Sequence, residues 1–538
     1  MSSSSLGRVL LLLLVCSAWL LPKSGAWVPR IRATSLGGWL VTEGWIKPSL
    51  FDGIPNNDLL DGTQLQFKSV TQNRYLVAED GGGAGILANR AQASGWETFK
   101  LWRINATTFH LRVFGNQFVG VDCTGRVVAT ATTPGPSETF QLVRRPGDKS
   151  RVRIRAPNGL FLQAKTRESV TADRREYTDW SDDDPSVFVT NSVKQLQGEY
   201  QLCNGYGTAK ATQVLRNHWS TFIKESDFRF MASSGLNAVR IPVGWWIASD
   251  PYPPFPFVGG SLQALDNAFR WAEKYNLGVI VDLHAAPGAQ NPSEHSGTRD
   301  GSQEWGTTDA SIAETVRVID FLASRYASSP SLLAVSLLNS PEAPGVTLSS
   351  LMKYYQDAYN AVRRHTSTAY VVMPARFSAD AAELLGFVGS FPLAVLDVHY
   401  YNLFSSKFNG LTVDQNIDFV RKNRSSELAA ITRPNGRPLT FVGEWTAEWN
   451  VKGATKVEYQ RFAKAQLDVY GQATFGWAYW MLKNVNNHWS MEWMIQNGYI
   501  KLNCSCSQSQ NAMISLEPNC HGKMEPSDNA EGEYYSSD

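Results

Sequence analysis

The sequence predicts an α/β protein whose main body is a (β/α)₈ barrel, or TIM barrel, with an all-β trefoil domain inserted in the first βα connection. Short strands repeat three times within residues 62–192. Outside that range, strands alternate with amphipathic helical stretches, which is typical of βαβ units. Polar residues also gather where the expected barrel strands end, and that is the face on which such barrels carry their active sites.

The first 26 residues have the pattern of a secretory signal peptide. Residues 1–8 are polar with one positive charge, residues 9–21 are almost wholly apolar, and small residues follow at 24–26. Thirteen apolar residues are too few to cross a bilayer, which needs ~20. We therefore expect a cleaved signal over residues 1–26 rather than a membrane anchor. The protein should then be secreted to the extracellular space or cell wall, with no membrane association after cleavage.

Five of the six cysteines remain after such a cleavage, because Cys16 leaves with the signal. An odd number implies at least one thiol that is free or paired between chains. We expect a C-terminal cysteine to pair with Cys203 or Cys520 and Cys123 to stay single; the alternative is that all five are reduced thiols in the core or on the surface. No cysteine spacing predicts a zinc site. Three triplets are acceptors for N-glycosylation in this compartment, at Asn105, Asn423 and Asn503.

Charge and aromatic content narrow the class of partner. The 538 residues carry 50 basic and 49 acidic side chains, for a net charge of +1, and contain no basic run. We therefore expect no nucleic-acid partner. The 18 Trp, 19 Tyr and 25 Phe are compatible with a carbohydrate-binding cleft, although most aromatic residues in a large protein belong to its core.

The insert is expected over residues 62–192, between a barrel start at 27–61 and the remainder of the barrel at 193–506. Its second strands begin at Tyr75, Phe118 and Phe161, a constant spacing of 43 residues. Three all-β units of this size cannot each bury a core, so they must share one. Threefold repetition of short strands is typical of a β-trefoil. Two roles remain open for it, a carbohydrate-binding module and a rigid insert without a ligand.

Eight strands and several helices are expected in the barrel. The strands are predicted at residues 31–41, 237–243, 278–284, 332–339, 370–374, 394–400, 439–443 and 476–480. The clearest helical segments are predicted at residues 220–233, 262–275, 310–326 and 348–364. The polar tail over residues 507–538 is expected to be disordered.

Polar and aromatic residues stand at the ends of six of these strands, and six such sets on one face of a barrel indicate an active site. They include Arg240, Asp282, His284, Asn339, Ser340, Glu342, Asp397, His399, Tyr401, Glu444 and Trp480. Three polar residues in loops near this face are expected to be solvated: His295, Glu304 and Glu448.

These strand ends, together with the stretches 36–40, 217–221, 286–291 and 475–480, resemble glycoside hydrolase family 5, especially its exo-β-1,3-glucanase and plant β-glucosidase branch. The insert resembles the fascin-like trefoils of plant sugar hydrolases. The resemblance implies a retaining enzyme that hydrolyses β-glucosides or cell-wall β-glucans, with transglucosylation as a further outcome. It implies a monomer that needs no metal or organic cofactor.

The resemblance also implies roles for the strand-end residues. Glu444 matches the nucleophile, an ionised carboxylate below the sugar ring. Tyr401 and Arg240 match the groups that orient this carboxylate and keep it charged. The other matches fall on positions that hold the hydroxyls of the sugar in the −1 subsite, or lie beneath that sugar: His284, Asn339, His399 and Trp480.

The acid/base position departs from the family pattern. The family reads Asn-Glu-Pro, whereas this chain reads Asn339-Ser340-Pro341, with Glu342 two places further on. Serine cannot act as a general acid near neutral pH, and such assistance is typically worth ~10²–10⁴-fold, so we expect a weakened enzyme. One alternative is that a loop shift makes Glu342 the substitute acid/base. The others are a catalytically inactive glucan-binding cell-wall protein and a sequence variant of an ordinary hydrolase.

Overall fold

The structure is a computed structural model that describes residues 30–176, 178–433 and 436–502. The predicted signal peptide and tail lie outside the described residues, as do Cys504, Cys506 and Cys520. Within the described part of the chain, Cys123 is exposed and unpaired, and Cys203 is buried and unpaired. The same part contains no helix that is long and apolar enough to cross a membrane.

Eight parallel strands close into a barrel, which confirms the predicted main fold. β1 pairs with β14 on one side and with β20 on the other, so the sheet has no free edge. In barrel order the strands are β1 (Ile31–Ser35), β14 (Ala238–Gly244), β15 (Gly278–Ala285), β16 (Leu332–Ser336), β17 (Tyr370–Pro374), β18 (Ala394–Asn402), β19 (Leu439–Trp449) and β20 (Gly476–Tyr479).

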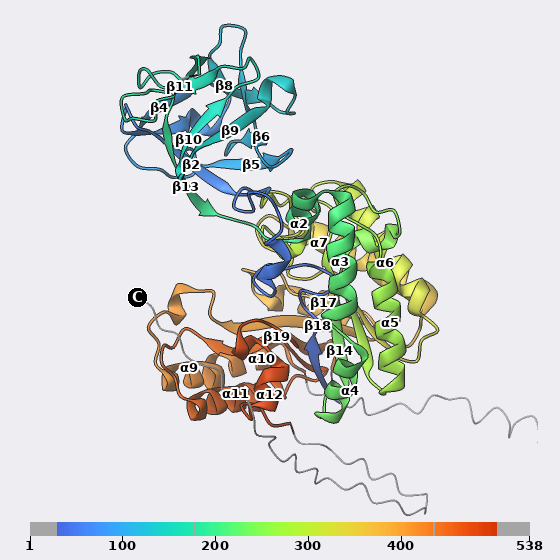
Figure 1. The fold of residues 1–538 in the computed structure, drawn as a ribbon. Coiled ribbons are helices and arrows are strands. Elements are labelled where there is room, and N and C mark those ends of the chain that lie inside the picture. Colours follow the sequence, from blue (N-terminus) through green and yellow to red (C-terminus); the bar gives the residue numbers. More distant parts are fainter. Residues whose placement is uncertain (1–29, 177, 434–435, 503–538) are drawn as a thin grey trace, which may run out of the picture. The chain divides into compact units, whose positions relative to one another are not determined.

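Helices surround these strands, and Figure 1 shows α3, α5 and α6 side by side on the outer face. The two longest helices start at capping threonines: the hydroxyl of Thr308 accepts from the backbone N–H of Ser311, and that of Thr347 from Ser350. The helices are α2 (Glu199–Tyr206), α3 (Thr208–Thr221), α4 (Glu225–Ser233), α5 (Ser261–Lys274), α6 (Asp309–Tyr326), α7 (Leu348–His365), α8 (Leu385–Gly389), α9 (Val413–Phe419), α10 (Ser425–Ile431), α11 (Lys456–Tyr470) and α12 (Met491–Gln496).

Several predicted elements have different bounds, and three of them differ most. The first strand ends at Ser35 because the chain turns at Gly38, whose φ of +70° favours glycine. The helix predicted at 220–233 is wrong: α3 ends at Thr221, and α4 begins after an extended Lys224 whose N–H is bound by the carboxylate of Asp227. The seventh strand continues for six residues beyond its predicted end at Gly443, to Trp449.

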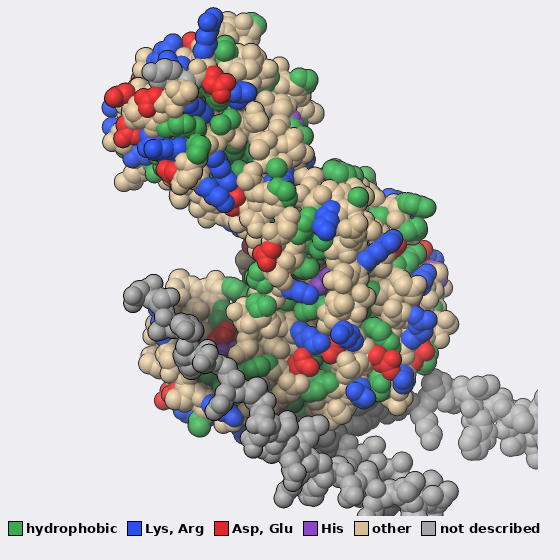
Figure 2. All heavy atoms as spheres, in the orientation of Figure 1, with side chains coloured by type: hydrophobic (Ala, Val, Ile, Leu, Met, Phe, Trp, Pro, Cys, Tyr) green, Lys and Arg blue, Asp and Glu red, His purple; other side chains and the backbone are tan. Residues whose placement is uncertain are grey.

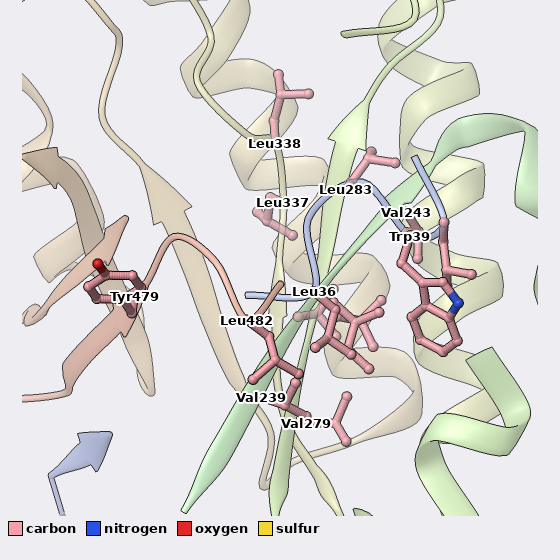
Figure 3. Packing of buried hydrophobic residues seen from close by; sticks show 14 of the residues in the cluster. Leu36, Trp39, Val239, Val243, Val279, Leu283, Leu337, Leu338, Tyr479 and Leu482 are labelled. Atoms are coloured by element: carbon pink, nitrogen blue, oxygen red, sulfur yellow. The ribbon is translucent and has the colours of Figure 1, made fainter. Parts of the chain in front are cut away.

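Apolar side chains fill the barrel at one end and surround it on the outside. Ala238, Ile280 and Phe441 belong to a buried cluster formed by residues from all eight strands or their immediate flanks. Neighbouring residues on the same strands, such as Val239 and Val279, belong to the large cluster that packs under the helices (Figure 3). Side chains therefore alternate between the two cores, as strand geometry requires.

A β-rich domain lies between β1 and α2 in the chain. Six of its twelve strands form a closed ring in which β2 pairs β5, β5 pairs β6, β6 pairs β9, β9 pairs β10, β10 pairs β13 and β13 pairs β2. The other six form three hairpins, β3–β4, β7–β8 and β11–β12. The strands are β2 (Gln64–Ser69), β3 (Arg74–Ala78), β4 (Ile86–Arg90), β5 (Phe99–Arg103), β6 (Thr108–Arg112), β7 (Phe118–Val121), β8 (Val127–Ala131), β9 (Phe140–Arg145), β10 (Asp148–Arg155), β11 (Phe161–Gln163), β12 (Thr171–Arg174) and β13 (Phe188–Lys194).

The repeat seen in the sequence corresponds to this strand pattern. Phe99, Phe140 and Phe188 begin β5, β9 and β13, and all three are buried in one shared cluster. On the face of the molecule in Figure 2, basic and acidic side chains are interspersed.

Candidate active site

A cavity of about 510 Å³ opens at the carboxyl ends of the barrel strands. Seven of the nine site residues expected from the sequence line it: His284, Asn339, Ser340, Glu342, Tyr401, Glu444 and Trp480. The other two, Arg240 and His399, lie behind the cavity wall in contact with Glu444. The structure therefore brings all nine expected residues to one place.

Strand periodicity places most of these side chains. Ala238 lies in the inner apolar cluster, and Arg240, two residues on, points the same way at the next level. Glu444 breaks this rule, because it is three residues beyond the inward-facing Phe441. The strand pairing explains the exception: Val398 faces Val442 but His399 faces Glu444, so Gly443 is an extra residue in a β-bulge. The bulge turns Glu444 into the cavity.

Glu444 is held by three side chains from two strands. Its Oε1 accepts a hydrogen bond from Arg240 Nη1 at 2.8 Å, and its Oε2 accepts one from the Tyr401 hydroxyl at 2.7 Å. His399 Nδ1 lies 3.4 Å from the same Oε2. Burial acts to raise the pKa of Glu444, but the charges of His399 and Arg240 outweigh it, so the pKa lies below its ordinary value. The carboxylate is ionised and fixed in position.

Arg240 is fully buried and joins Glu444 to the rest of the cavity wall. Its Nη2 lies 3.0 Å from Asp282 Oδ2 and donates to Asn339 Oδ1 at 2.7 Å. Burial acts to lower the pKa of this guanidinium, but Asp282, Glu444 and the nearby Asp397 raise it, so it stays charged. Because Asn339 Oδ1 is occupied by Arg240, the Asn339 amide group is oriented with its N–H₂ toward the His284 side of the site.

His284 and Trp480 form a stacked pair in the wall of the cavity. Their rings are 5.3 Å apart and nearly parallel, at 6°. His284 Nδ1 lies 2.7 Å from Asp282 Oδ2, which orients the imidazole. Trp480 is only 4 % exposed, and Gly37 makes room for its ring, since a Cβ at residue 37 would lie 2.8 Å from a ring carbon. Gly37 therefore serves the position of Trp480, whereas a Cβ on the neighbouring Gly38 would meet Ile46.

Ser340 occupies the loop after β16 and contacts His399 on β18. Its Oγ lies 3.2 Å from His399 Nδ1, and its carbonyl accepts from Asn291 Nδ2 at 3.0 Å. The residue has a φ of +44°, a conformation that is uncommon outside glycine. Glu342 also lines the cavity, and its backbone N–H donates to the carbonyl of Gln290 at 3.0 Å.

Several cavity residues were not singled out from the sequence. Glu43 is 3 % exposed, and its Oε2 accepts from Trp45 Nε1 at 3.0 Å. Burial raises the pKa of Glu43 well above its ordinary value, and Glu294 and Glu444 raise it further. The sequence does contain a signal for Glu43, because this carboxylate closely follows the first barrel strand in the chain and such loops form the active-site face. The remaining missed lining residues are Trp45, Asn291, Pro292, Ser293, Glu294, Phe377, Phe404 and Trp489.

The three polar residues expected to be solvated differ from one another. The Glu304 side chain is 64 % exposed, as expected. His295 instead lines the cavity, where burial, with His284 nearby, lowers its pKa to about 3, so that this ring is neutral. Glu448 belongs to β19 rather than to a loop, and its carboxylate binds Tyr459 and His488. The expectation was therefore wrong for His295 and Glu448.

An ionised carboxylate held by Arg and Tyr, in an aromatic-walled cavity at the strand ends of a (β/α)₈ barrel, is the arrangement of a glycosidase. The model of the family described as cellulase (glycosyl hydrolase family 5) matches residues 203–486. The chain belongs to glycosyl hydrolase family 5, and the protein is a glycosidase. A second family model, a domain of unknown function (DUF7910), matches residues 56–193.

Fungal proteins are among its relatives. A probable glucan 1,3-β-glucosidase A of Emericella nidulans is 32 % identical over 355 residues, which are 58 % of this chain and 85 % of that protein. A glucan 1,3-β-glucosidase of Blumeria graminis is 34 % identical over 346 residues, 56 % of this chain and 77 % of that protein. Among solved structures, the rutinosidase of Aspergillus niger aligns over 56 % of this chain and 88 % of that chain, with 21 % identity and a TM-score of 0.49.

Proposed function

We propose that this protein is a retaining glycoside hydrolase of β-glucosides or cell-wall β-glucans, and that Glu444 is its nucleophile. The observation that carries the proposal is the triple clamp on Glu444 by Arg240, Tyr401 and His399. The names of the two fungal relatives, which are glucan 1,3-β-glucosidases, support the substrate class.

In this mechanism Glu444 attacks the anomeric carbon and forms a covalent glycosyl-enzyme, which water then hydrolyses with net retention. Arg240 and Tyr401 hold the two carboxylate oxygens in place and keep the group ionised. Trp480 lies beside the sugar as an apolar platform, and Asn339 Nδ2 serves the 2-hydroxyl. His284, fixed by Asp282, binds a neighbouring hydroxyl. Each role follows from a contact that already exists around the cavity, so little reorganisation is needed at the moment of reaction.

The usual carboxylic acid is replaced by Ser340, and this substitution favours a second candidate function. A chain that binds glucan without turnover would need the cavity but no proton donor. Glu342 is the nearest carboxyl group in sequence and lines the same cavity. Retaining enzymes place their two carboxyl groups ~5–5.5 Å apart, so Glu342 would act as acid/base only if its side chain reached that distance from Glu444.

A mechanism-based inactivator separates catalysis from binding alone. A 2-deoxy-2-fluoro-β-glucoside with a dinitrophenyl leaving group should inactivate the protein, and peptide mass spectrometry should find the label on Glu444. The matched variant Glu444→Gln keeps the side chain's shape and should abolish both labelling and turnover. Labelling of Glu342 or Glu448 would overturn the assignment, and absence of any labelled or turned-over β-glucoside would favour the binding protein.

We further propose that residues 62–192 form a β-trefoil of the fascin-like kind that binds polysaccharide, in a barrel of the plant branch of the family. A six-stranded ring with three hairpins, built from three units that share one core, supports this proposal. The ends of the insert pair directly, since Gln64 faces Lys194 across β2 and β13. A linker from Asp61 to Ser192 should therefore leave the barrel folded and active on small glucosides while weakening polysaccharide binding. A barrel that does not fold would make the insert structural.

The compartment and the oligomeric state are also part of the proposal. The apolar stretch at residues 9–21 supports secretion after cleavage near residue 26. N-terminal sequencing of protein recovered from the medium, and its mass in solution, would test secretion and the monomer together.

A further inference from the structure

A continuous line of three side chains leads to the acid/base position, and it shares His399 with the Glu444 clamp. Asp397 Oδ2 lies 3.2 Å from His399 Nε2, and His399 Nδ1 lies 3.2 Å from Ser340 Oγ. Ser340 lines the cavity and is 9 % exposed, whereas the His399 and Asp397 side chains are 5 % and 0 % exposed. The line therefore runs from a buried carboxylate through an imidazole to a hydroxyl that a substrate can reach.

Both ends of this line are fixed by the backbone. The N–H of Gly443 donates to Asp397 Oδ1 at 2.8 Å, and a Cβ at residue 443 would lie 2.3 Å from that oxygen. Ser340 is held by the Asn291 amide and adopts a left-handed φ of +44°. Strained backbone of this kind persists where the surrounding structure requires it, and it clusters at functional sites.

His399 faces charged groups from several elements. Asp397 lies on its own strand, Glu444 on β19 and Arg240 on β14, and the neutral His295 is also close enough to interact. Burial acts to lower the pKa of His399, but Glu444 and Asp397 outweigh burial and Arg240, so the pKa lies above its ordinary value. A protonated imidazole cannot take a proton from Ser340, which argues against Ser340 as a nucleophile toward esters. The protonated His399 can instead supply a proton to the Ser340 hydroxyl.

We infer that Ser340, His399 and Asp397 form a proton relay that replaces the missing carboxylic acid of this glycosidase. The inference rests on the proposed function, because it needs Glu444 as nucleophile. Ser340 is the catalytic residue of the relay, since its hydroxyl meets the leaving oxygen. His399 acts through Ser340, and Asp397 positions His399.

The relay serves both steps of the retaining reaction. In the first step, the bond between the anomeric carbon and the leaving oxygen breaks as Glu444 Oε forms its ester bond. The leaving oxygen takes the Ser340 hydroxyl proton, and the proton on His399 Nδ1 passes to Ser340 Oγ. In the second, a water oxygen attacks the anomeric carbon and the ester bond to Glu444 breaks. The water proton passes to Ser340 Oγ, whose own proton returns to His399 Nδ1.

The experiment compares two substrates that differ in their need for an acid. Dinitrophenolate leaves unaided, whereas the sugar alkoxide of laminaribiose does not. The relay predicts that the full chain hydrolyses laminaribiose and that Ser340→Ala lowers this kcat/KM by ~10²–10⁴-fold, the usual worth of general acid catalysis. The kcat/KM for dinitrophenyl glucoside, which reports only the steps up to departure of the leaving group, should fall by less than ~3-fold in Ser340→Ala, and this also shows that the variant folds. Ser340→Gly, which suits the left-handed φ, should behave in the same way.

Two further variants sharpen the result. Ser378→Ala changes an exposed serine of similar φ, +64°, in the next loop and should leave both substrates unaffected. Ser340→Glu places a carboxylic acid at the family position and should exceed the natural chain on laminaribiose. Because His399 must hold its proton, laminaribiose kcat/KM should decline as the pH rises through the raised pKa of His399. The dinitrophenyl glucoside should lack this decline.

The outcomes separate the relay from the function on which it rests. If neither substrate is hydrolysed and Glu444 is not labelled, the proposed function fails. If the dinitrophenyl glucoside is hydrolysed but laminaribiose is not, or if Ser340→Ala leaves laminaribiose hydrolysis unchanged, the relay alone is wrong. Loss of laminaribiose hydrolysis in Glu342→Gln, with Ser340→Ala unaffected, would assign the acid to Glu342 and overturn the relay.

Discussion

Tyr401→Phe tests the clamp on Glu444 quantitatively. The change removes the 2.7 Å hydrogen bond to Glu444 Oε2 and keeps the ring, which packs beside Phe404 and Trp489. A hydrogen bond to a charged group is worth about 1.5–3 kcal/mol, and one pKa unit is 1.36 kcal/mol. Loss of the bond should therefore raise the pKa of Glu444 by about one to two units. Because the nucleophile must be ionised, activity should then be lost at a higher pH during acidification.

The assay is the pH dependence of kcat/KM for dinitrophenyl β-glucoside, which reports the free enzyme. The acid limb should move up in Tyr401→Phe. Tyr459→Phe is the matched control, since Tyr459 donates to the carboxylate of Glu448 at 3.0 Å outside the cavity lining, and its acid limb should not move. An acid limb that stays in place in Tyr401→Phe, or moves down, would refute the claim that Tyr401 keeps Glu444 ionised.

Two further changes test the supports of the site. Gly37→Ala should displace the Trp480 ring and lower kcat/KM by about 10²-fold, the usual effect of a 1 Å misplacement. Gly386→Ala is the control and should leave kcat/KM unchanged, because no atom lies near its new Cβ. Equal activity of the two variants would contradict the role of Gly37. Burial raises the pKa of Glu199 to about 7, from an ordinary value of 4.5. The folded state therefore holds this proton more tightly than the unfolded state. The stabilisation of the fold from that proton is fully present below about pH 4.5 and is lost as the pH rises through 7. Glu199→Gln, which keeps an acceptor for Thr42, should stabilise the protein at pH 8 by on the order of 3 kcal/mol more than at pH 4, measured by unfolding; a pH-independent effect would contradict this.

The strand pattern is the part of the fold that the sequence predicts best. The period-2 rule and the βαβ alternation predict where Arg240, His284 and Asn339 come together, because parallel strands end at one face. The inward turn of Glu444 could not be predicted, since it depends on a bulge at Gly443 that follows from pairing with β18. The break between α3 and α4 depends similarly on a local cap by Asp227.

The contact between Ser340 and His399 is also beyond sequence reasoning. Ser340 follows β16 and His399 lies on β18, with β17 between these strands, so their contact depends on the tertiary arrangement of the barrel. The sequence alone shows only that Ser340 replaces the expected acid/base glutamate. The structure shows in addition that its hydroxyl contacts His399, which in turn contacts the buried Asp397. Glu43 differs, because its position shortly after the first barrel strand marks it as a candidate, whereas its raised pKa arises from burial that no local pattern predicts.

The stereochemistry of the first product tests the central claim most directly. Proton NMR recorded during the first minutes of dinitrophenyl β-glucoside hydrolysis distinguishes β-glucose from α-glucose before the two interconvert. A covalent intermediate on Glu444 predicts that β-glucose forms first, with α-glucose rising later by mutarotation. Initial release of α-glucose would mean that water attacks the substrate directly, and would contradict the role of Glu444 as nucleophile.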